Sequence, residues 1–182
     1  DRTVVTLMTL AGFALDGMTR DQGWRFLSIG RRLERLQSMS QTIAHALAAA
    51  RPGREADLDW LLEAADSIVT YRSRYMARPE WMPVLDLLVL DESNPRSISF
   101  QVLGLHDFLV RLAESFGPCD EGLFEPLIAR LHALDAARDL QPGSAALPAL
   151  LGDLQSLSYS LSDLLTMRFF SHVAQSQRSF AR

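Results

Sequence analysis

Residues 29–47 read IGRRLERLQSMSQTIAHAL, and this stretch decides the fold class. Apolar residues recur in it at alternating spacings of four and three, with a serine in one position: Ile29, Leu33, Leu36, Ser40, Ile43 and Leu47. This period places them along one face of an α-helix. We therefore predict a long helix that begins near residues 19–21 and ends at Ala50, with an apolar face that packs in a helical bundle.

Helical periodicity recurs in the rest of the chain, and no stretch has the apolar/polar alternation of a half-buried strand. The other predicted helices cover about residues 3–15, 55–78, 81–90, 95–116, 123–140 and 145–177, with Asn94 as N-cap and Pro95 at the first position of the fourth. Short connections favour antiparallel neighbours. We predict an all-α protein, an antiparallel helical bundle of about six to seven helices, some long, in one domain spanning residues 1–182.

The composition excludes several classes of function. All 18 basic residues are arginine, so lysine chemistry such as Schiff-base formation is excluded. A net charge of −4 gives no attraction to nucleic acid or to an anionic membrane. No apolar stretch approaches the roughly 20 residues of a membrane-spanning helix, and a cytoplasmic location is the expectation. We predict neither a nucleic-acid partner nor a membrane.

Some charged residues lie in line with apolar ones. In the predicted helix 55–78, the apolar series leads through Arg72 and Tyr75, so the Arg72 guanidinium is expected to point inward. In the last predicted helix the leucine series leads into Arg168 in the same way. Glu34, flanked by Arg31 and Arg35, is placed to be the counter-ion.

Arg96 is unusual for a different reason. A cation in the first turn of a helix is opposed by the helix dipole, so it needs a negative partner. The sequence offers Asp91, Glu92 or a ligand anion for this role.

Two interpretations of these residues stay open. In one, they form structural ion pairs that fix how the helices pack. In the other, they line a polar pocket between helices that binds a carboxylate or phosphate. The candidate residues are Arg31, Glu34, Arg35, Tyr71, Arg72, Tyr75, Arg96, Gln101 and Arg168. Metal-binding patterns such as Glu-x-x-His and His-Glu-x-x-His are absent, and we predict no metal and no cofactor.

Several ordered segments carry a resemblance to a known family. They are GWRFLSIGRRLER (residues 23–35), YRSRY (71–75), VLDLLVLD (84–91) followed by NPRS (94–97) and Gln101, and LSD (161–163) with RFF (168–170). Together they resemble the bacterial alpha-E domain family, a helical domain named for its Glu-Arg motif. The resemblance covers essentially the whole chain and matches the later part of that domain. It implies that the chain belongs to a longer alpha-E protein or fusion.

The resemblance also implies a partner. Members of this family occur beside, or fused to, circularly permuted ATP-grasp proteins, often with transglutaminase-like peptidases. It implies an accessory domain in an ATP-dependent system that forms amide bonds, one that docks the ATP-grasp protein or positions a small carboxylate-bearing substrate without catalysis of its own. Two alternatives remain. One is an enzyme with Glu34 as general acid/base, and the other is a structural bundle that forms a homodimer through apolar faces.

Overall fold

The computed structural model describes residues 2–50 and 56–171. Every regular element in these residues is a helix, so the predicted all-α fold is confirmed. The α-helices are α1 (Arg2–Gly12), α2 (Gln22–Ala49), α3 (Ala56–Ala64), α4 (Ile68–Tyr75), α5 (Trp81–Leu85), α6 (Ile98–Phe116), α7 (Glu125–His132), α8 (Ala136–Asp139) and α9 (Ala146–Leu165). The π-helical turns are η1 (Phe13–Gly17), η2 (Asp86–Leu90) and η4 (Thr166–Phe170), and η3 (Glu121–Phe124) is a 3₁₀ turn.

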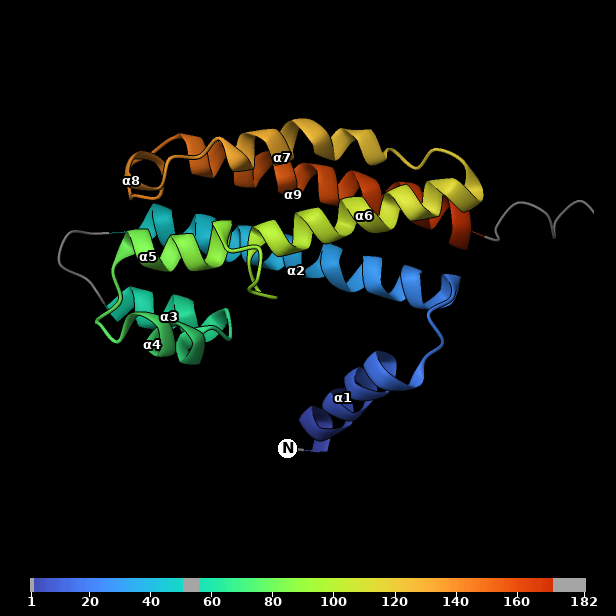
Figure 1. The fold of residues 1–182 in the computed structure, drawn as a ribbon, viewed down its shortest axis with the longest axis horizontal. Coiled ribbons are helices and arrows are strands. Elements are labelled where there is room, and N and C mark those ends of the chain that lie inside the picture. Colours follow the sequence, from blue (N-terminus) through green and yellow to red (C-terminus); the bar gives the residue numbers. More distant parts are fainter. Residues whose placement is uncertain (1, 51–55, 172–182) are drawn as a thin grey trace, which may run out of the picture.

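The long helix α2 organises the bundle. It packs against α6 and α9, and both run antiparallel to it (Figure 1). Helix α7 packs against α9 and α6, so four helices follow the long axis of the molecule. The short pair α3 and α4 lies at one end of α2, whereas α1 lies apart from the other helices (Figure 1). Among the described residues, no helix is long and apolar enough to cross a membrane.

The apolar face of α2 is the centre of the core. Ile29, Leu36 and Ile43 are at most 1% exposed, which confirms the period read from the sequence. Ser40 is buried in the same row, and its hydroxyl oxygen has no hydrogen-bond partner. The predicted start is also confirmed, because Asp21 caps α2 by accepting a hydrogen bond from the backbone N–H of Trp24 at 3.1 Å.

The predicted helix 55–78 is wrong in one respect, since it is two helices. Asp66 has a positive φ of 50°, and the Ser67 N–H donates to the Leu62 carbonyl at 2.8 Å, as at a helix C-terminus. The break rotates the buried face of α4. Tyr71 is therefore the buried residue, while Val69, which was expected inside, is 78% exposed.

The expected inward position of Arg72 is wrong for the same reason. Its side chain is 69% exposed and lies 3.7 Å from the Asp59 carboxylate, which is its counter-ion in place of Glu34. This pair lies on the surface, where ion pairs contribute little to stability.

The start of α6 also differs from the prediction. Ser97, not Asn94, is the N-cap, and its hydroxyl accepts from the Phe100 N–H at 3.0 Å. Asn94 is buried in the preceding loop, where it donates to the Leu87 carbonyl at 2.9 Å and accepts from the Arg96 N–H at 3.1 Å. It fixes the loop that holds Arg96.

The predicted helix 123–140 is divided into α7 and α8, with Asp135 as the N-cap of α8. The last predicted helix ends earlier in regular form, because α9 passes into the π-helical turn η4. The wider turn takes Arg168 off the leucine face, so the residue is exposed and the expectation that it points inward is wrong. Residues from His172 onward lie outside the described residues.

Candidate anion-binding cavity

A cavity of about 490 Å³ lies between α2, the α3–α4 turn and the N-terminal half of α6. Four arginines and three aromatic residues contribute to its wall. The lining residues are Trp24, Ser28, Arg31, Arg32, Arg35, Asp66, Thr70, Asn94, Pro95, Arg96, Phe100 and Phe108.

Helix α2 builds one wall because of its spacing. Trp24, Ser28, Arg31 and Arg35 are separated by four, three and four residues, which places them on one helix face beside the buried apolar face. The opposite wall includes Asp66 at the helix break and the Asn94–Arg96 loop. The irregular backbone on that side therefore positions its polar groups.

Arg32 is held along α6 by contacts with two rings. Its guanidinium carbon lies 4.6 Å from the ring centre of Phe100 and 5.5 Å from that of Phe108. It also donates to the Phe100 carbonyl at 2.8 Å. Burial and the nearby Arg35 charge lower the pKa of Arg32, with a smaller opposing effect of Asp107. Gly104 provides the space, because a Cβ atom there would overlap the guanidinium.

The other arginines lack enough counter-ions. Arg96 forms an ion pair with Asp66, which was not among its expected partners. Within residues 2–50 and 56–171, Arg31 and Arg35 form no hydrogen bond or ion pair through their guanidinium groups. Burial, followed by the charges of Arg96 and Arg31, lowers the pKa of Arg35. One carboxylate, that of Asp66, lines a cavity with four guanidinium groups.

The comparisons with known proteins identify the family. Residues 1–170 match the model of the Alpha-E family, described as a predicted alpha-helical domain with a conserved ER motif. This chain belongs to the Alpha-E family. Uncharacterized proteins of Mycobacterium bovis and Mycobacterium tuberculosis are each 29% identical to it over 177 residues, which cover 90% of this chain and 19% of theirs. The chain thus spans about a fifth of the length of these relatives. No solved structure matches it.

The Glu-Arg pair of this Alpha-E domain is Glu34-Arg35, and its two residues face different surroundings. Arg35 lines the cavity, whereas Glu34 is exposed and is not part of the wall. Of the other candidates, Arg31 and Arg96 also line the cavity. Gln101 lies behind it, donating to the Pro95 carbonyl at 2.6 Å and accepting from Arg32 at 3.4 Å.

The remaining candidates lie elsewhere in the Alpha-E domain. The Tyr71 hydroxyl donates to the Arg78 carbonyl at 3.3 Å, and the Tyr75 ring packs on Tyr71 with centroids 4.8 Å apart. Burial, and secondly the charge of Asp86, raises the pKa of Tyr75. Tyr71 and Tyr75 therefore join α4 to the segment before α5 and do not line the cavity.

Arg168 has a structural environment at the far end of α6. It donates to the carbonyls of Phe116 and Pro118, and a cation at that helix end is favoured by the dipole. It also lies beside Cys119, where burial raises the thiol pKa more than the Arg168 charge lowers it. Arg168 thus links η4 to the end of α6, away from the cavity.

Sequence reasoning missed Arg32 and the aromatic wall. Arg32 occurs in the Glu-Arg segment and was available as a candidate. Phe100 and Phe108 lie on α6 two turns apart, on one face. Pairing this aromatic face with the arginine-rich face of α2 was the available signal, although it required knowing that α2 and α6 are neighbours.

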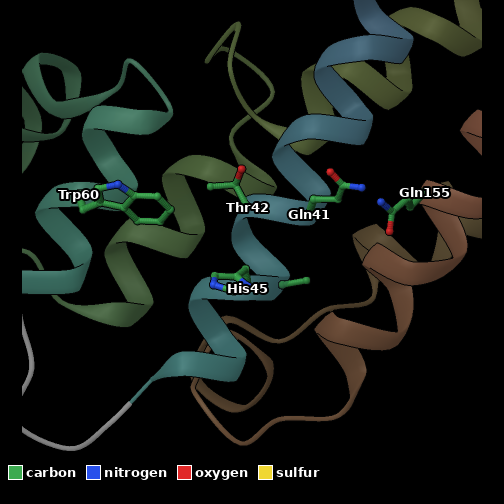
Figure 2. Close-up of a pocket in the computed structure, with 6 residues that line it drawn as sticks. Gln41, Thr42, His45, Trp60 and Gln155 are labelled. Carbon is green, nitrogen blue, oxygen red and sulfur yellow. The ribbon is translucent and has the colours of Figure 1, made fainter.

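A second hollow of about 540 Å³ crosses α2 further along the helix. Figure 2 shows His45, Gln41 and Thr42 on α2, with Trp60 of α3 on one side and Gln155 of α9 on the other. Its wall has amide, hydroxyl, imidazole and indole groups but no acidic or arginine side chain. In the part of the chain that the structure describes, no cluster of His, Cys, Asp or Glu could hold a metal ion.

Proposed function

We propose that this Alpha-E domain binds the carboxylate group of a small substrate in the arginine-lined cavity, as an accessory domain of an ATP-grasp system that forms amide bonds. The observation that carries the proposal is the presence of four guanidinium groups and one carboxylate around the same cavity. Arginine presents paired donors that match the two oxygens of a carboxylate.

Electrostatics supports an anion in this place. Arg35 is partly buried among Arg31 and Arg96, and each neighbouring cation disfavours its charged form. A bound carboxylate would offset this repulsion and supply the acceptors that Arg31 and Arg35 lack. The aromatic rings and the buried Gln101 hold Arg32 and the loop in position, so little ordering is required on binding.

The position of Glu34 supports an accessory role over catalysis at this cavity. A general acid/base must reach the reacting group within about 3 Å or through one water. Glu34 faces solvent on α2 and does not line the cavity. The ATP-grasp partner would supply the phosphoryl and acyl chemistry, and this domain would hold the carboxylate.

Calorimetric titration of the full chain with N-acetylglycine tests the binding step. Arg35→Gln should weaken binding by about tenfold or more, since a hydrogen bond to a charged group contributes ~1.5–3 kcal/mol. Arg130→Gln is the matched control, because Arg130 is an exposed arginine paired with Asp153 at 2.5 Å between α7 and α9. N-acetylglycine amide should not bind. Equal affinity of wild type and Arg35→Gln, or no binding of N-acetylglycine, would contradict the proposal.

A second measurement tests the ATP-grasp connection separately. ATP turnover by the ATP-grasp protein of the same organism is recorded with the wild-type chain and with both variants. We expect Arg35→Gln to reduce the turnover that depends on this protein, and Arg130→Gln to leave it unchanged. If N-acetylglycine binds but turnover is the same for all three proteins, the carboxylate site stands and the ATP-grasp role is wrong.

A further inference from the structure

A second cavity, about 420 Å³ in volume, adjoins the arginine-lined one on the side of α1. Its walls include Leu10 and Phe13 from the first two elements, Met18 from the connection that follows, and Leu27 and Arg31 from α2. Arg31 is its only charged lining residue. The cavity is therefore an apolar space with one cation at its edge.

Arg31 lines both cavities, which joins them into one surface feature. Leu27 lies one turn before Arg31, and Arg35 lies one turn after it. An arginine has an apolar stem and a charged head. Arg31 can therefore contact an apolar group through its stem while its guanidinium contacts an anion.

The apolar side is incompletely covered in this protein. Phe13 is 65% exposed, Leu10 59% and Leu27 39%, and no residue of α1 is buried. A ligand that places an apolar group here removes these surfaces from water, and each buried methylene adds about fourfold to affinity.

From this juxtaposition we infer that the ligand is a carboxylate with an apolar side chain, such as an amino acid or short peptide that ends in leucine. The carboxylate lies among Arg31, Arg35 and Arg96, and the side chain lies against Leu27 and Phe13. This inference rests on the proposed function, because it takes the arginine-lined cavity as the carboxylate site. It adds the class of side chain that the site selects.

Calorimetric titration of the full chain with three probes tests the inference. The probes are N-acetylglycine, N-acetylleucine and N-acetylleucine amide. We expect N-acetylleucine to bind at least tenfold more tightly than N-acetylglycine, and the amide to lose most of that affinity. Leu27→Ser should reduce the preference for leucine to less than threefold while leaving N-acetylglycine binding unchanged. Leu123→Ser, an exposed leucine in η3, is the control and should keep the full preference.

The outcomes separate this inference from the proposed function. Equal binding of N-acetylglycine and N-acetylleucine would overturn the inference and leave the carboxylate site in place. If no probe binds, both fail. A second variant, Phe13→Ser, changes the opposite wall and should also reduce the leucine preference. A dimer that Phe13→Ser dissociates, measured by light scattering without any ligand, would show that a second copy covers this cavity and would overturn the inference.

Discussion

Replacing Gly104 by alanine tests how Arg32 is held in the cavity. An alanine in a helix interior is normally favoured over glycine by about 1 kcal/mol. At position 104, however, the added Cβ would lie 2.8 Å from Nη2 of Arg32 and nearer to its Cζ and Nη1. The guanidinium must move, which breaks its hydrogen bond to the Phe100 carbonyl and its contacts with both rings.

The size of the effect follows from these contacts. A hydrogen bond to a charged group contributes ~1.5–3 kcal/mol, and a cation–π contact adds ~0.5–1 kcal/mol. After the gain from helix propensity, Gly104→Ala should lower the free energy of unfolding by about 1–3 kcal/mol. Gly152→Ala in α9 is the control, because no atom lies within 4 Å of its added Cβ and this variant should be stabilised by about 1 kcal/mol.

Urea unfolding followed by circular dichroism measures both variants. The same substitution is then made in an Arg32→Ala background, where Gly104→Ala should stabilise the protein as Gly152→Ala does. If Gly104→Ala and Gly152→Ala stabilise the wild type equally, then Arg32 does not occupy the space over Gly104, and this account of the cavity wall is wrong.

Three further predictions concern stability. Ser40→Ala should raise the free energy of unfolding by about 1 kcal/mol in urea unfolding, because it removes a buried hydroxyl without a partner; a loss of stability would show that the hydroxyl is bonded. Asn94→Ala should cost ~1–3 kcal/mol in the same assay, since it leaves the Leu87 carbonyl without its donor, and an unchanged midpoint would contradict this. The Arg138 guanidinium lowers the pKa of Asp139 to about 2, so this carboxylate stabilises the fold above its unfolded pKa of about 3.9 and loses that effect as the pH falls through about 2. The difference in melting temperature between wild type and Asp139→Asn should therefore be largest at neutral pH and shrink between pH ~4 and ~2, whereas a difference independent of pH would count against it.

The parts of the fold that follow from periodicity were predictable. Ile29, Leu36 and Ile43 are buried because α2 is regular over its whole length, so the period in the sequence equals the period in space. The Asp21 cap was predictable for a similar reason, since a side-chain oxygen before a helical segment satisfies a free N–H.

The helix breaks were not predictable from the sequence. The turn at Asp66 contains neither glycine nor proline, and only tertiary packing keeps this aspartate at a positive φ. Once the phase of the helix was lost there, every inference about which face Arg72 occupies was lost with it. The same applies to Arg168, which the π-helical turn η4 moves off the apolar face of α9.

Half of the candidate cavity depended on neighbours in space. The cationic face of α2 was readable, because Arg31 and Arg35 are separated by one helical turn. The counter-ion of Arg96 was not, since Asp66 lies 30 residues earlier and is brought near by the break between α3 and α4.

The position of α2 between α6 and α9 has a consequence for synthesis of the chain. The core face of α2 is complete only when α9 packs on it, and α9 begins about a hundred residues after α2 ends. At a translation rate of ~5–20 residues per second, this interval lasts roughly five to twenty seconds. During that time Leu36 and Ile43 lack one of their two neighbouring helices. The nascent chain therefore exposes its most apolar surface until the ribosome has made the last helix.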